Sequence, residues 1–82
     1  MTNVREVFSE NVDLDSVTFL FNDGSVISVS LDVSKVVDAQ CYATARKTAH
    51  QFLDALGDDD RWEGKIDFEG NILQSPVRVS VI

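Results

Sequence analysis

Alternating hydrophobic residues predict a β-hairpin in the first half of the chain. Two apolar sets recur at every second position: Val17, Phe19 and Phe21, then Ile27, Val29 and Leu31. A two-residue turn at Asp23-Gly24 would place these sets on opposite faces, whereas a three-residue loop over residues 22–24 places them on one face. We therefore predict a hairpin over residues 15–31 that has Gly24 in the left-handed conformation. This register sets Leu20 directly opposite Val26 on the outer face.

The middle of the chain has the spacing of an amphipathic helix over residues 34–56. Its apolar residues recur at steps of three and four: Val37, Cys41, Ala45, Ala49, Phe52, Leu53 and Leu56. Asp32 or Ser34 can cap its N-terminus, and Gly57 is suited to the left-handed residue that ends a helix.

Residues 62–82 predict a second hairpin, with a two-residue loop at Gly70-Asn71. This loop pairs Phe68 with Leu73, Gly64 with Val77 and Trp62 with Val79 on the apolar face. On the solvent face it sets Glu63 opposite Arg78 as a cross-strand charge pair. Because Pro76 cannot donate to a strand ladder, we expect an edge or a bulge there.

The predicted order of elements is (α)ββαββ within a single domain, residues 1–82. Residues 1–14 form a lead-in, in which residues 3–10 are either a short helix capped by Asn3 or a loosely packed segment. The two hairpins and the long helix each offer one apolar face. We therefore expect an α+β two-layer sandwich: a four-stranded, mainly antiparallel sheet with the helix packed on one face.

Charge sets this chain apart more than its hydrophobicity does. The formal net charge is −7 in 82 residues, and no basic residue occurs between Arg5 and Lys35. An acidic chain is poorly suited to bind nucleic acid or an anionic lipid surface directly. The longest apolar run, residues 19–21, is too short to span a membrane. With a single cysteine and no signal-peptide pattern, we expect a soluble cytoplasmic protein.

The candidate chemistry does not indicate an enzyme. His50 lies on the polar helix face without a matched nucleophile, and Cys41 lies on the apolar face as a small hydrophobe. The four glycines are scattered and form no phosphate-binding loop. Asp58, Asp59 and Asp60 carry oxygen ligands, but their spacing departs from a calcium loop. We therefore expect no catalytic residues, no metal and no cofactor.

Two surfaces are candidates for partner binding. The first is Asp58-Asp59-Asp60 followed by Arg61-Trp62, because Trp and Arg are enriched at binding hot spots. Its alternatives are a solvated acidic loop and, for Trp62, a lid on the core. The secondary candidate is the Leu20/Val26 pair on the outer face of the first hairpin, which could also mediate a homodimer.

In size, charge and architecture the chain resembles small acidic proteins of phages and mobile elements, including anti-CRISPR proteins and other nucleic-acid mimics. No motif carries this resemblance, so no family residues are transferred. The acidic excess, the stretch without basic residues and the absence of catalytic groups, together with this resemblance, lead us to predict a non-enzymatic inhibitor that blocks a basic, nucleic-acid-handling protein partner. The alternatives are an assembly module that self-associates through a sheet edge, and an acidic domain of another role.

Overall fold

The computed structural model describes residues 5–31, 39–57 and 60–79, and it contains five strands and one helix there. In chain order these are β1 (Val7–Val12), β2 (Ser16–Phe21), β3 (Val26–Ser30), α1 (Ala39–Leu56), β4 (Trp62–Asp67) and β5 (Ile72–Arg78).

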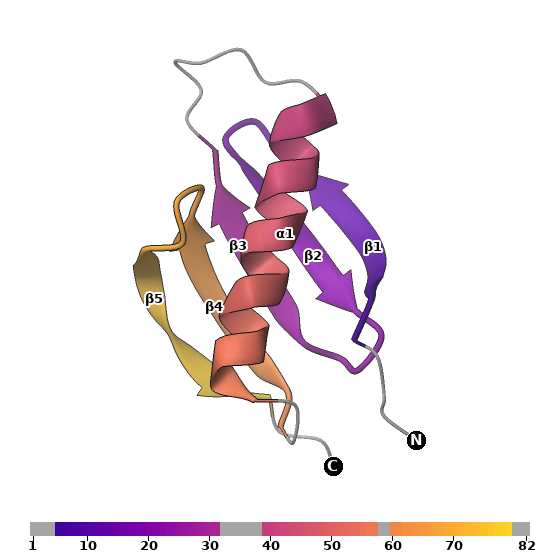
Figure 1. Cartoon of the computed structure of the whole chain (residues 1–82), viewed down its shortest axis with the longest axis vertical. Helices are drawn as coiled ribbons and strands as arrows, with labels where there is room; N and C mark the ends of the chain where they lie inside the picture. The colour runs from indigo at the N-terminus through magenta and orange to yellow at the C-terminus, as the bar shows by residue number, and fades with distance from the viewer. Residues whose placement is uncertain (1–4, 32–38, 58–59, 80–82) are drawn as a thin grey trace.

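The strands form a single mixed sheet in the order β1-β2-β3-β4-β5. The β3–β4 pair is parallel and the other three pairs are antiparallel. The helix lies across one face of the sheet, with β1 and β5 at opposite edges (Figure 1). The predicted α+β architecture with a helix on one face is therefore confirmed, but the sheet has five strands rather than four.

The fifth strand is β1, in the segment that we expected to be a lead-in or a short helix. It pairs antiparallel with β2, from Ser9 opposite Leu20 to Val12 opposite Val17, and has a bulge between Val7 and Ser9. All its residues except Val7 are exposed, so its sequence lacks the clean alternation that marks a half-buried strand. Pairing with β2 determines this strand, and a single segment read alone does not carry that information.

The core lies between the helix and one face of the sheet. Its buried apolar residues are Val17, Phe19, Phe21, Ile27, Val29, Leu31, Ala45, Ala49, Leu53 and Ile66. The three helical members recur every four residues, as predicted for the helix face that packs on the sheet. The small side chains of Ala45 and Ala49 let the helix approach the large residues of β2 and β3.

The predicted end of the helix is confirmed: α1 ends at Leu56, and Gly57 follows with a φ of 94°. The predicted caps Asp32 and Ser34, and Val37 on the apolar face, lie outside the described residues.

The first hairpin has the predicted register. Val17 lies opposite Val29, Phe19 opposite Ile27 and Leu20 opposite Val26. The loop spans residues 22–24, because the Phe21 amide donates to the Ser25 carbonyl at 2.9 Å and the Gly24 amide donates to the Phe21 carbonyl at 3.0 Å. Gly24 has a φ of 96°, as this loop requires.

The predicted register of the second hairpin is wrong. Its loop has three residues, 68–70, rather than two, and the Asp67 amide donates to the Asn71 carbonyl at 2.9 Å. Trp62 therefore lies opposite Arg78, and Glu63 lies opposite Val77. The expected Glu63–Arg78 pair does not form. The register also shifts twice along β4–β5, and one of these shifts spans the part of β5 that contains Pro76. As expected for a strand with a proline, β5 lies at an edge of the sheet.

Local chemistry explains the longer loop. The Asp67 carboxylate accepts hydrogen bonds from the amides of Glu69 and Asn71, at 2.9 and 2.8 Å, and from the Asn71 side chain at 2.9 Å. These contacts lower the pKa of Asp67, chiefly through the Asn71 side chain and amide. Gly70 then takes the positive φ of 93° that closes a three-residue loop.

Candidate partner-binding surface

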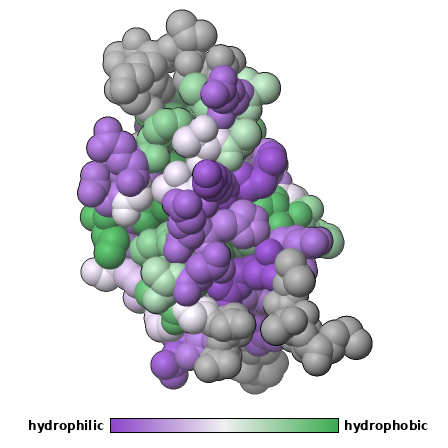
Figure 2. Space-filling view, viewed as in Figure 1, coloured by the Kyte–Doolittle hydropathy of each residue, from purple (hydrophilic) through white to green (hydrophobic). Residues whose placement is uncertain are grey.

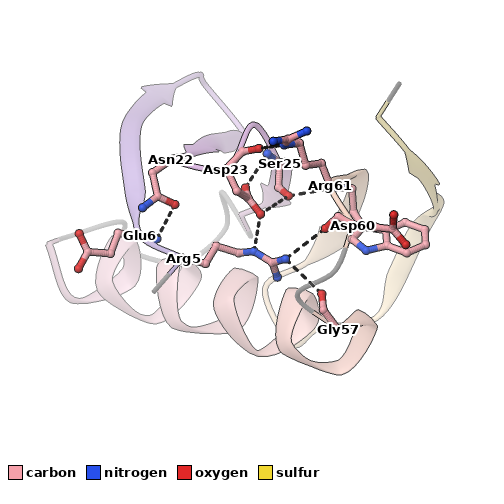
Figure 3. A network of polar contacts seen from close by, with 9 residues as sticks. Arg5, Glu6, Asn22, Asp23, Ser25, Gly57, Asp60 and Arg61 are labelled. Carbon is pink, nitrogen blue, oxygen red and sulfur yellow. Dashed lines mark hydrogen bonds and ion pairs between the residues drawn. The ribbon is translucent and has the colours of Figure 1, made fainter. Parts of the chain in front are cut away.

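The predicted acidic-aromatic patch is only partly described by the structure. Asp58 and Asp59 lie outside the described residues. Asp60, Arg61 and Trp62 lie where the chain passes from the end of α1 into β4. There they join a polar network that also includes the β2–β3 loop and the residues before β1 (Figure 3).

Arg5 connects three separate segments in this network. Its Nε donates to Asp23 Oδ2 at 2.7 Å, and its Nη2 donates to the carbonyls of Gly57 and Asp60, at 3.1 and 3.2 Å. Only 7% of its side chain is exposed. A cation beside the last carbonyls of a helix is favourable because the C-terminal end of the helix dipole is negative. Arg5 therefore holds the β2–β3 loop against the C-terminal end of α1.

Asp23 receives most of the hydrogen bonds in the β2–β3 loop. Partial burial raises the pKa of its carboxyl, but hydrogen bonds from the Ser25 amide, Arg5 and the Ser25 hydroxyl outweigh it and lower the pKa overall. The Ser25 amide and hydroxyl lie 2.8 and 3.2 Å from the two carboxylate oxygens. These contacts favour the ionised carboxylate and use both of its oxygens within the chain.

Ser25 and Arg61 attach the same loop to the start of β4. Ser25 is fully buried, and its hydroxyl accepts the Trp62 amide at 3.1 Å. Arg61 Nε donates to the Asp23 carbonyl, and the Arg61 side chain lies beside Gly24. Two residues of the predicted patch therefore make contacts within the chain: Arg61 through its side chain and Trp62 through its backbone amide.

Trp62 packs partly against the core, in agreement with its alternative role as a lid. The Arg78 guanidinium lies over its ring, 5.8 Å from the ring centroid, and also pairs with Asp60 at 3.4 Å. The Trp62 indole nitrogen is buried and has no acceptor among the described residues. The Trp62 ring therefore already has contacts within the chain, both with the core and with Arg78.

The secondary candidate, Leu20 with Val26, is partly buried on the sheet face opposite α1. Beside this pair the hydroxyls of Thr18 and Ser28 lie 3.0 Å apart. The small apolar pair is therefore bordered by hydroxyl groups that bond to each other. This surface is mixed in polarity and contains no large apolar anchor.

The structure brings together a third surface that our sequence analysis missed. We call residues 6–15, which comprise β1 and the segments on either side of it, the acidic edge. Phe8, Val12 and Leu14 are 75%, 53% and 95% exposed. The same segment contains four exposed acids: Glu10 and Asp13 lie between these apolar residues, and Glu6 and Asp15 lie just outside them. Seen from the helix side, hydrophobic surface flanks the polar helix on both sides (Figure 2).

A signal for the acidic edge was present in the sequence. Residues 6–15 contain four acids and belong to the stretch without any basic residue. Charged side chains are common on edge strands, but we treated this segment as a lead-in. One basic side chain reaches the edge from α1, where Arg46 pairs with Glu10.

The groups considered for catalysis have structural surroundings. The His50 ring packs edge-on against Phe21, with ring centroids 5.0 Å apart, so the ring is partly covered although we placed His50 on the polar helix face. The described residues contain no group of three or more His, Cys, Asp or Glu side chains placed to hold a metal ion. In that same part of the chain, no helix combines the length and the apolar character needed to cross a membrane.

No protein-family model, curated protein or solved structure matches this chain.

Proposed function

We propose that this protein is a non-enzymatic binding module that covers a basic, nucleic-acid-handling surface of another protein. The observation that carries the proposal is that all four arginines, residues 5, 46, 61 and 78, make contacts within the protein. Each one contacts an oxygen atom of the chain itself. These contacts leave fewer arginine side chains available to a partner, and the excess of 14 acidic over seven basic residues gives the protein a negative field.

The exposed carboxylates are distributed unevenly. Glu6, Asp13 and Asp15 gather on the acidic edge, with Glu10 between them in contact with Arg46. A second set of exposed acids, Asp54, Glu63 and Glu69, is spread over α1, β4 and the β4–β5 loop. The net negative charge of the protein would attract a basic partner, and the acidic edge would bind it, because acids and exposed apolar side chains lie together there.

The test compares two charge-neutral triple variants with the original protein. Glu6→Gln/Asp13→Asn/Asp15→Asn removes three acids from the edge, and Asp54→Asn/Glu63→Gln/Glu69→Gln removes three elsewhere, so both change the net charge from −7 to −4. Each protein is used at low and high salt to capture proteins from a lysate. Captured proteins are then tested for displacement of bound DNA or RNA.

We expect salt-sensitive capture of basic nucleic-acid-binding proteins, release of their nucleic acid, and a larger loss for the edge variant than for its control. Capture of no such protein at low salt would overturn the proposal. Equal losses for the two variants would support the role of net charge and refute the assignment to the edge.

Exposed apolar residues on both outer strands favour a second candidate, an assembly module that self-associates through a sheet edge. On the β5 side these residues are Ile72, Leu73 and Val77. Sedimentation at several concentrations tests this candidate, with Leu20→Glu as the variant for pairing through the outer face. A strict monomer would exclude self-association.

A further inference from the structure

We propose that β1 binds an extended, lysine- or arginine-rich segment of the partner as a sixth strand of the sheet. This inference rests on the proposed function and specifies how the basic partner is held. It depends on three properties of the acidic edge: the direction of its main-chain groups, its exposed apolar side chains and its charge.

Among the described residues, β1 is an edge strand, and some of its main-chain hydrogen-bonding groups point away from β2. The Asp13 amide donates to the Ser16 carbonyl at 2.8 Å, so the main-chain N–H and C=O groups of Asp13 point toward β2. The register between Ser9 and Val12 is constant, and facing groups alternate along an antiparallel strand. Ser9 and Asn11 therefore also face β2, while the N–H and C=O groups of Glu10 and Val12 point away from the sheet.

The side chains specify the partner's chemistry. Val12 and its exposed neighbours Phe8 and Leu14 suit apolar positions of an added strand. Glu6, Asp13 and Asp15 lie beyond both ends of the regular stretch, where they can pair with basic side chains. An extended segment that alternates basic and apolar residues satisfies both requirements, and main-chain pairing supplies the geometry.

The opposite edge is less suited to this role. In β5, Pro76 lacks an N–H group, and two register shifts interrupt the strand. A second copy of this chain is also a poor match for β1. It would bring a further charge of −7 and the same set of acids to the edge.

The first experiment follows amide hydrogen exchange by NMR in the full chain as a basic peptide is added. The probe is a capped peptide of about ten residues in which lysine alternates with valine. We expect new protection at the amides of Glu10 and Val12. Those of Ser9 and Asn11, already bonded to β2, should change little. A control peptide with the same sequence but alternating L- and D-residues keeps the charge, but its side chains lie on one side of the extended chain, so lysine and valine cannot occupy opposite faces of an added strand.

The second experiment uses Val12→Pro, with Val12→Thr as its control. Proline removes an N–H that points away from β2, so the existing ladder is preserved, and proline is tolerated at such edge positions. Threonine keeps both the N–H and the β-branched shape. We expect Val12→Pro to bind the peptide about tenfold more weakly or worse, and Val12→Thr to bind it nearly as well as the original. Circular dichroism verifies that both variants remain folded.

The outcomes separate this inference from the proposed function. Salt-sensitive peptide binding without protection at Glu10 and Val12, or equal binding of the L- and mixed-chirality peptides, overturns strand addition and leaves an acidic binding module. Absence of binding to either peptide and to lysate proteins overturns both. Dimerisation that Val12→Pro abolishes overturns the basic partner in favour of a second copy.

Discussion

The two hairpins use the same kind of loop but differ in what surrounds their strands. Both turn through three residues, the last of which is a glycine with positive φ, Gly24 or Gly70. The β2–β3 hairpin is regular and alternates buried with partly exposed residues. In β4–β5 the register shifts twice and most of β5 is exposed. Burial of one face enforces register in the first hairpin, whereas turn chemistry and an edge proline shape the second.

The largest expected contrast comes from the same substitution in each hairpin. Ile27 in β3 is fully buried, whereas Ile72 in β5 is 57% exposed. We expect Ile27→Ala to lower the free energy of unfolding by about 2–5 kcal/mol and Ile72→Ala by about 0.5 kcal/mol or less. Urea unfolding followed by circular dichroism measures both. Similar losses would mean that β5 is buried in solution, contrary to the comparison.

The two loop glycines provide the next contrast. A valine at either position must adopt an unfavourable positive φ, which costs at least about 1–2 kcal/mol. We expect Gly24→Val to cost more than Gly70→Val. A Cβ at residue 24 would lie 3.2 Å from Arg61 Cδ, whereas one at residue 70 has 3.6 Å to Thr48. Matched urea titrations decide the order, and a larger loss for Gly70→Val would contradict it.

The two loop aspartates predict different effects of acid. Both have a pKa below the ordinary value of 3.8, so each stabilises the fold above that value and loses its effect as pH falls through its folded pKa. Asp23 links Arg5 and Ser25, whereas the carboxylate of Asp67 bonds to Glu69 and Asn71 of its own loop.

We therefore expect Asp23→Asn to remove on the order of 1 kcal/mol of stability at neutral pH, after allowance for solvent screening. The effect of Asp67→Asn should be smaller. Both variants should approach the stability of the original protein as the pH drops below 3.8, because the original then loses the same ionic contacts. Urea unfolding at neutral and acidic pH tests this, and a difference that grows in acid would refute the assigned pKa directions.

The smallest expected effect tests the corrected register of β4–β5. Arg78 lies over Trp62 rather than opposite Glu63. A double-mutant cycle with Arg78→Ala and Trp62→Phe should give a coupling of about 0.5–1 kcal/mol. The matched cycle with Glu63→Gln should give a coupling near zero. A clear coupling between Arg78 and Glu63 would support the two-residue loop instead.

Sequence patterns predicted those parts of the fold in which burial leaves a periodic trace. The alternation of β2 and β3 was sufficient to place Leu20 opposite Val26, and the apolar spacing of α1 with Gly57 was sufficient to place its end. The register of β4–β5 failed because Asp67, rather than side-chain alternation, sets the loop length. The predicted two-residue loop and the observed three-residue loop differ in length by only one residue, and this difference is enough to shift the register.

The candidate surface was harder to predict, because it depends on contacts between distant segments. Nothing local to Arg5 reveals that it bonds to Asp23 and to the carbonyl of Asp60. Likewise, the acidic character of residues 6–15 is visible in the sequence, but their position at an open edge depends on pairing with β2. Charge could be counted in advance, while its spatial arrangement required the fold.

The position of Trp62 gives the protein an internal optical reporter. It is the only tryptophan, and its amide is bonded to Ser25 where the two hairpins meet. Intrinsic fluorescence therefore follows that junction, while far-ultraviolet circular dichroism follows mainly α1. Coincident curves in denaturant would mean that both hairpins unfold as one cooperative unit. A fluorescence change at lower denaturant would mean that β4 and β5 separate first and leave a smaller folded remnant.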